Sequence, residues 1–232
     1  MKKVAIMQPY LFPYIGYWQA INAVDEYVLY DDVTYIKGGW INRNNILLNG
    51  QSHLITLPLE NSSSFKLINE IFVTSNIKIK EKLCKTIYMA YSKAPYFEWV
   101  YPIIEKSIIK DGIISEIIYE TILGICDYIG IKTKILLSSK IDKNSELKAE
   151  EKVINIVTKL NGKIYINAIG GQELYNKENF NKNNIDLYFI KTNSVEYKQF
   201  NNAFVPNLSI IDVLMFNSKE EVRELLNQYE LI

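Results

Sequence analysis

The N-terminal stretch of the chain constrains its fold more than any other segment. Residues 4–7 are apolar and partly β-branched, which favours a short strand, and Gln8-Pro9 ends it because proline cannot donate a ladder hydrogen bond. A helix is expected to begin within residues 17–21, and residues 26–30 predict a second strand. Strand, helix and strand in close succession are typical of a parallel pair. This opening unit therefore predicts a parallel sheet with helices packed against it.

Polar side chains follow both of these strands. Gln8 comes directly after the first strand, and Asp31 and Asp32 come after the second. Because ligands of parallel α/β sheets usually bind at the carboxyl ends of strands, we expect these side chains to converge on one rim with an open hollow between them. The alternative is that an aspartate closes a loop through the backbone, as this residue type readily does. That alternative explains one carboxylate better than two adjacent ones.

Strands and helices alternate along the rest of the chain. Strands are expected at 46–48, 52–59, 68–73, 134–137, 163–167 and 187–190, and Asn49-Gly50 predicts a tight hairpin turn between the first two of these. Helices are expected at 78–91, 96–109, 113–129, 146–160, 209–216 and 219–229. The pattern predicts an α/β fold with a mainly parallel sheet flanked by helices. We expect a single domain over residues 1–232, in which residues 78–130 form a helical sub-lobe.

The composition excludes several classes of function. The chain has 26 basic and 26 acidic side chains, so non-specific binding to nucleic acid through a basic surface is not expected. Cys84 and Cys126 lie far apart and are expected to be buried free thiols. His53 is the single histidine and lies in an expected strand, so any histidine-based relay would have to use it, and a structural role is the favoured alternative. A histidine-rich metal site cannot be built. We therefore expect neither a metal ion nor a cofactor.

The sequence also bears on localisation. Lys2-Lys3 is followed by only a short apolar run before Gln8, which is too short for the core of a signal peptide. No run approaches the roughly 18 apolar residues that a membrane-spanning helix needs. These observations predict a cytoplasmic protein without a membrane span.

The loop that follows residues 26–30 supplies a group of candidate binding residues. Lys37 and Arg43 suit a diphosphate, because a guanidinium binds phosphate oxygens bidentately; neutralisation of the two aspartates is the alternative. Trp40 and Tyr35 could stack on a flat ligand or cover the core. The remaining members of the expected substrate-binding set are Gln8, Tyr10, Tyr17, Asn42 and Asn44.

Five blocks of sequence together resemble the WbqC-like protein family. They are QPYLFPYIGYWQAI, YVLYDDVTYIKGGWINRNNI, AYSKAPYF, YINAIGGQELY and YKQFNNAFVPNLSIIDVLMFN, and they span nearly the whole chain. The resemblance implies a role in bacterial surface-polysaccharide biosynthesis, such as lipopolysaccharide O-antigen or capsule, often with 4-amino-4,6-dideoxyhexoses. The opening block also resembles that of tryptophanyl-tRNA synthetases, which implies a Rossmann-like, nucleotide-binding sheet.

The family resemblance implies a transferase that moves an acyl or aminoacyl group onto the amine of a nucleotide-linked amino sugar. The amine must lose a proton as it attacks, so Asp31 or Asp32 is the expected catalytic base. Asn42 and the amides of Gly38-Gly39 could donate to the developing oxyanion. The expected donor is an acyl thioester or an acyl carrier protein. Two alternatives stay open: an ATP-dependent ligase that forms an adenylate, and a non-catalytic subunit that binds the nucleotide sugar or a carrier protein.

Overall fold

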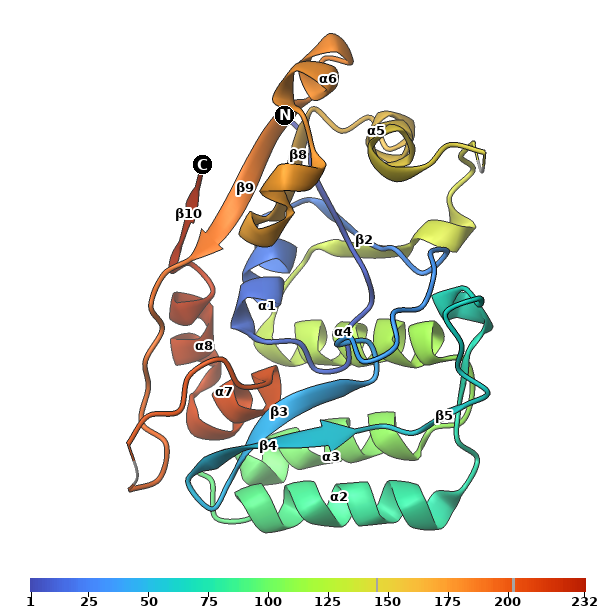
Figure 1. Ribbon diagram of the computed structural model, residues 1–232. Helices are drawn as coiled ribbons and strands as arrows, with labels where there is room; N and C mark the ends of the chain where they lie inside the picture. Colours follow the sequence, from blue (N-terminus) through green and yellow to red (C-terminus); the bar gives the residue numbers. More distant parts are fainter. Residues whose placement is uncertain (145, 202) are drawn as a thin grey trace.

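A six-stranded sheet forms the upper half of the molecule in Figure 1. The structure is a computed structural model that describes residues 1–144, 146–201 and 203–232. The strand order is β10–β9–β8–β1–β2–β7. The strands are β1 (Lys3–Met7), β2 (Glu26–Leu29), β7 (Lys134–Leu137), β8 (Ile164–Ala168), β9 (Asp186–Thr192) and β10 (Tyr229–Leu231). All neighbours pair in parallel except β10, which is antiparallel to β9. The mainly parallel α/β sheet expected from the sequence is confirmed.

Strand β1 lies in the middle of the sheet, and the strand order reverses beside it. The chain runs from β1 to β2 and β7 on one side, and then returns to β8 and β9 on the other. In open parallel sheets, ligands usually bind at the carboxyl ends of strands near such a reversal. The loop after β1 therefore lies where a site is expected.

Side chains of β1 alternate between two apolar layers. Val4 and Ile6 pack in one cluster with side chains of α5 and α6, whereas Ala5 packs in the other with side chains of α1, α4, α7 and α8. Figure 1 shows these helices on both faces of the sheet. Their bounds are α1 (Ile15–Asn22), α4 (Ile114–Ile129), α5 (Ala149–Lys159), α6 (Lys177–Lys182), α7 (Ile210–Phe216) and α8 (Lys219–Leu225). Within the described residues, no helix is both long and apolar enough to cross a membrane.

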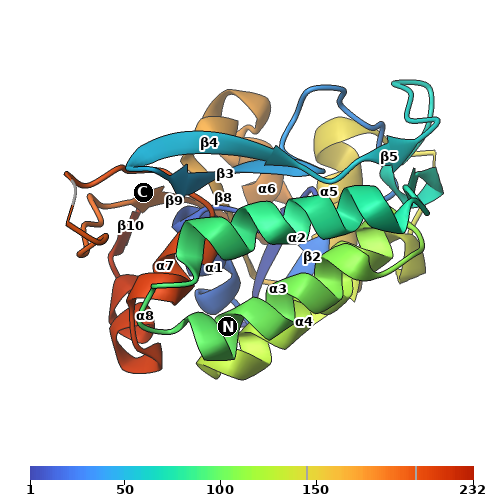
Figure 2. The same cartoon turned by 90° about the horizontal axis from the view of Figure 1, so that it is seen from below.

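A hairpin and two further helices complete the lower half of the molecule. The hairpin pairs β3 (Arg43–Leu48) with β4 (Gln51–Thr56) in antiparallel register. Its turn residues Asn49 and Gly50 both have positive φ, as the expected tight turn requires. Figure 2 shows the hairpin above α2 (Ile77–Tyr91), beside which lie α3 (Phe97–Ile109) and α4. The hairpin and the helical middle segment are thus confirmed.

Several expected elements differ in the structure. The strand expected at 52–59 is divided, because β4 ends at Thr56 and Leu59 belongs to another two-stranded sheet. Residues 68–73 form a 3-10 turn, η1 (Ile68–Glu70), and only Phe72–Val73 is a strand, β6, paired with β5 (Leu59–Glu60). The turn closes because Glu70 Oε2 accepts a hydrogen bond from the backbone N of Leu67 at 2.8 Å.

The last expected helix, residues 219–229, ends early. Helix α8 stops at Leu225, and β10 follows it. The buried Gln19 explains this change, because its Nε2 donates to the carbonyl oxygens of Leu225 at 2.9 Å and Gln228 at 3.0 Å. These bonds satisfy the helix end and turn the chain towards β9.

Candidate functional site

Two adjoining hollows form a groove at the carboxyl edge of the sheet. A cavity of about 580 Å³ is lined by residues that include Thr192 at the end of β9, Tyr197 and Phe204. A second hollow of about 370 Å³ is lined by Tyr10, Pro13, Tyr14, Trp40, Asn44 and Asn207. Tyr14 and Asn207 line both hollows, so the two lie side by side. We call the whole the edge groove, with a Trp40 end and a Tyr197 end.

The loop of residues 8–14 is held rigidly along one side of this groove. Asn44 Nδ2 donates to the carbonyl oxygens of Leu11 at 3.2 Å and Phe12 at 2.9 Å. Ser209 Oγ donates to the same Phe12 oxygen at 2.7 Å, and Trp18 Nε1 donates to the Pro13 oxygen at 3.1 Å. The backbone of Phe12 adopts a φ of 44°, a conformation that such clamping must stabilise. Asn44 therefore supports the wall of the groove as well as lining it.

The Trp40 end combines aromatic surface with positive charge. Trp40 is 46% exposed, and the Arg43 guanidinium lies 5.9 Å from the centre of its ring. Arg43 is oriented by hydrogen bonds from Nε to the Gly39 oxygen at 2.9 Å and from a terminal nitrogen to the Gly38 oxygen. Lys37 is exposed in the same loop. The structure thus brings Trp40 and Arg43 together beside the groove.

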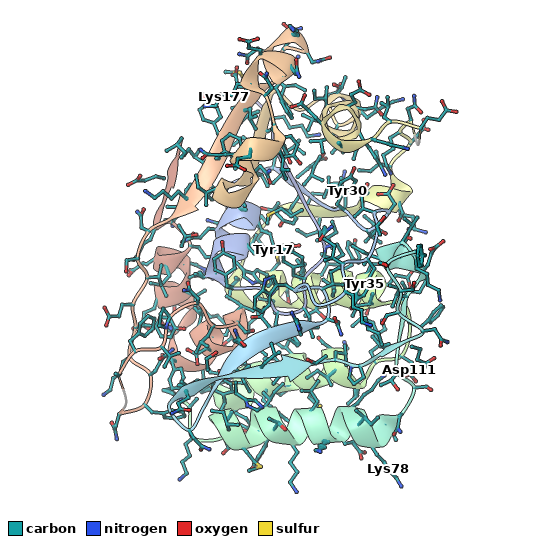
Figure 3. All side chains as sticks on the ribbon, in the orientation of Figure 1. Tyr17, Tyr30, Tyr35, Lys78, Asp111 and Lys177 are labelled. Carbon is teal, nitrogen blue, oxygen red and sulfur yellow. The ribbon has the colours of Figure 1, made fainter. Side chains whose placement is uncertain are left out.

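Several other residues of the expected binding set are buried and support the walls. Tyr17 donates from its hydroxyl to the Gln8 carbonyl oxygen at 2.9 Å, and its ring lies 5.7 Å from that of Tyr10. The Tyr35 hydroxyl donates to Asn42 Oδ1 at 3.0 Å, and Asn42 Nδ2 donates to the Leu57 carbonyl oxygen at 2.9 Å. Figure 3 shows Tyr17 near the middle of the molecule and Tyr35 farther to the right. These hydrogen bonds position the loops, while Tyr10 itself lines the groove.

Asp31 lies at the expected edge, but its carboxylate is already engaged. The backbone N of Tyr30 donates to the Met7 oxygen at 2.7 Å, so the ends of β1 and β2 are adjacent. Asp31 is 1% exposed, and its two oxygens accept from the N of Ser139 at 2.8 Å and from its Oγ at 2.6 Å. The 3-10 turn Ser138–Lys140 thus fills the space where the sequence led us to expect a hollow. The edge groove lies on the other side of β1, towards β9.

Asp32 forms an ion pair with two lysines. Its Oδ2 lies 3.0 Å from Lys143 Nζ and 2.9 Å from Lys152 Nζ, and all three side chains are largely buried. Burial by itself would raise the pKa of Asp32, but the Ser138 hydroxyl and the two ammonium groups outweigh this effect and hold the pKa below its ordinary value. A carboxylate with a lowered pKa is a weaker proton acceptor. The role of base for Asp31 or Asp32 stays a prediction.

A third carboxylate, which the sequence reasoning did not single out for chemistry, lies beside the Tyr197 end. Asp212 is fully buried in α7, and its Oδ1 accepts from the Tyr197 hydroxyl at 2.7 Å and from Gln199 Nε2 at 2.6 Å. Its Oδ2 accepts from the Tyr91 hydroxyl at 2.9 Å. Burial raises the pKa of Asp212 above its ordinary value, although these hydrogen bonds favour the charged form. The signal in the sequence was a lone aspartate within the apolar run IIDVLMF.

Comparison with known proteins places the chain in a family. It is 28% identical over 233 residues to the uncharacterized protein Rv1507c of Mycobacterium tuberculosis (strain ATCC 25618 / H37Rv), a match that covers 97% of this chain and 98% of that protein. No solved structure matches the chain. The model of the WbqC-like protein family matches residues 8–224, which include both ends of the edge groove. The chain therefore belongs to the WbqC-like protein family.

Proposed function

We propose that the protein transfers an acyl or aminoacyl group onto the amine of a nucleotide-linked amino sugar bound in the edge groove. The observation that carries this proposal is the groove itself, which lies at the carboxyl edge of a parallel sheet and combines aromatic walls with an adjacent guanidinium. The family resemblance described above supplies the substrate class. The product would enter surface-polysaccharide biosynthesis.

The Trp40 end suits the nucleotide part of such a substrate. Trp40 and Tyr10 present flat faces on which a base or sugar ring would stack. Arg43 and Lys37 would neutralise the diphosphate, and the guanidinium of Arg43 lies beside the Trp40 ring. The acyl donor in this proposal is a thioester, either free or attached to a carrier protein.

Replacing Trp40 with alanine is expected to weaken binding of a UDP-linked 4-amino-4,6-dideoxyhexose by about tenfold or more. The loss of one aromatic stacking partner is typically worth about 1–3 kcal/mol, which corresponds to this change. Isothermal titration calorimetry measures the dissociation constant. Trp99→Ala is the matched control, because Trp99 is another exposed tryptophan, 62% exposed, that lies on α3. Equal affinities for the wild-type protein and Trp40→Ala would contradict the binding mode.

A second candidate function is non-catalytic presentation of the nucleotide sugar to another enzyme. It is favoured by the engagement of Asp31 with Ser139 and of Asp32 with two lysines. If the protein only presents the nucleotide sugar, binding should depend on Trp40 in the same way, but no amide product should form. Mass spectrometry of the sugar nucleotide after incubation with acetyl-coenzyme A separates the two, since transfer adds an acetyl group and presentation leaves the mass unchanged.

A further inference from the structure

We propose that the Tyr197 end of the edge groove receives the amine of the sugar, and that Tyr197 accepts a proton from it while passing its own to Asp212. This inference rests on the proposed function and deepens it by giving the substrate a direction in the groove. Three observations carry it: the place of Tyr197, the hydrogen bonds around Asp212 and the distribution of charge along the groove.

Tyr197 connects the cavity to a buried carboxylate. Tyr197 is among the residues that line the cavity of about 580 Å³, and its hydroxyl donates to Asp212 Oδ1 at 2.7 Å. A phenol oxygen that donates its one proton can still accept a hydrogen bond. Phe204 packs edge-on against the Tyr197 ring at 5.1 Å between centroids and fixes its orientation. An N–H group in the cavity would thus meet an acceptor whose own proton already points at a carboxylate.

The groups around Asp212 are all donors and are all neutral. Gln199 donates at 2.6 Å and Tyr91 at 2.9 Å, in addition to Tyr197. Gln199 is itself held by a bond from the Val205 backbone N to its Oε1 at 2.7 Å. Because the described residues supply no cation in hydrogen-bond contact with Asp212, burial disfavours its negative charge and favours protonation. Asp32, in contrast, faces two lysines.

The charges beside the groove differ between its ends. Arg43 lies beside Trp40 at one end, where a diphosphate would lie, and Lys37 is exposed in the same loop. At the Tyr197 end, the acidic residue Glu196 is among the lining residues, and the carboxylate of Asp212 lies behind the Tyr197 hydroxyl. An ammonium group is favoured at the negative end, since a charged donor makes a stronger hydrogen bond than a hydroxyl. A nucleotide-linked amino sugar would therefore lie with its diphosphate towards Arg43 and its amine towards Tyr197.

The proposed step balances as an aminolysis of a thioester. The bound ammonium group first releases one proton to water, because only the neutral amine can attack. The amine nitrogen then forms a bond to the acyl carbon, and the carbon–sulfur bond breaks with its electron pair leaving on sulfur. One proton moves from nitrogen to the Tyr197 oxygen as the Tyr197 proton moves to Asp212. The thiolate then takes up a proton, which Asp212 releases through Tyr197, so the products are an amide and a thiol.

The test compares Tyr197→Phe with Tyr91→Phe. Each variant removes one phenol that donates to Asp212, but only Tyr197 is among the residues that line the edge groove. With a UDP-linked 4-amino-4,6-dideoxyhexose and acetyl-coenzyme A, Tyr197→Phe is expected to lower kcat by about 100-fold, the usual scale for one general acid–base group. The KM for acetyl-coenzyme A should change little. Tyr91→Phe removes a donor to Asp212 but no residue of the groove, so it should lower kcat by at least tenfold less than Tyr197→Phe does. Thermal unfolding shows whether both variants fold.

A binding measurement keeps this inference separate from the proposed function. The wild-type protein is expected to bind the amino sugar nucleotide about tenfold more tightly than its hydroxyl counterpart, and Tyr197→Phe should lose this preference. Turnover that is unchanged in Tyr197→Phe would overturn the inference and leave the function standing. If the protein prefers the amino sugar nucleotide, loses this preference in Tyr197→Phe and yet forms no amide, the proposed transfer is wrong and the placement of the amine at Tyr197 is supported. No preference in the wild-type protein would overturn the inference.

Discussion

Replacing Asp212 with alanine is expected to lower the free energy of unfolding by roughly 3 kcal/mol. The change leaves Tyr91, Tyr197 and Gln199 without their common acceptor, and each buried donor without a partner costs about 1–3 kcal/mol. The substitution also removes the cost of burying the Asp212 carboxylate, which offsets part of this loss. The three donors come from α2 and from the irregular segment between β9 and α7, so the substitution would loosen that segment. Urea denaturation followed by circular dichroism measures the change.

The pH dependence of this effect has a definite sign. The pKa of Asp212 is raised in the folded protein, so the contribution of its protonation to stability is fully present below the ordinary carboxyl pKa and is lost as pH rises through the raised value. Asp212→Asn has no such group. The stability advantage of the wild-type protein over Asp212→Asn should therefore shrink as pH rises from acidic to neutral. An advantage that grows over this range would contradict the raised pKa.

Replacing Asp32 with asparagine is expected to cost a similar amount, roughly 3 kcal/mol at neutral pH. The substitution leaves Lys143 and Lys152 buried without their carboxylate, and breaking a buried ion pair typically costs about 3–5 kcal/mol. Lys152 would retain its bond to the Asp32 backbone oxygen at 3.2 Å and its contact with the Tyr30 ring, which moderates the loss. Figure 3 shows Tyr30 above Tyr35 on the right of the view. Urea denaturation measures the effect.

The control for this substitution is Glu220→Gln. Glu220 is an exposed carboxylate 3.5 Å from Arg223, and exposed pairs contribute about 0–1 kcal/mol. The pH trend should oppose that of Asp212: the lowered pKa of Asp32 stabilises the fold above the ordinary carboxyl pKa, and this contribution is lost as pH falls through the lowered value. If Asp32→Asn lowers the free energy of unfolding at neutral pH no more than Glu220→Gln does, the ion pair of Asp32 with the two lysines does not stabilise the fold as the geometry indicates.

Elements set by local sequence were predictable. The Asn49-Gly50 turn fixed the hairpin, and Gln8-Pro9 marked the end of β1, because both act through the backbone of their immediate neighbours. The helix expected at 113–129 likewise ends at Ile129, where Gly130 follows with a φ of 83°. The alternation of strands and helices along the chain also predicted the mainly parallel sheet.

Only part of the candidate site was predictable from the sequence. Trp40 and Tyr10 were expected to bind a ligand because they lie in loops directly after or between strands, and both line the groove. Tyr197 and Thr192 were not expected there, because their position depends on where β9 pairs within the sheet. Asp212 meets Tyr91 across a long stretch of chain, and no periodicity encodes such a contact. The same holds for Ser139, which fills the space beside Asp31.

A crystal structure with a bound UDP-linked 4-amino-4,6-dideoxyhexose tests the account most directly. We expect electron density along the edge groove, with the base against Trp40, the diphosphate near Arg43 and the amine within hydrogen-bond distance of the Tyr197 oxygen. Density for the ligand elsewhere would contradict the account. An example is a separate cavity between α3 and α4, also of about 580 Å³, which Lys106 and Tyr128 help to line.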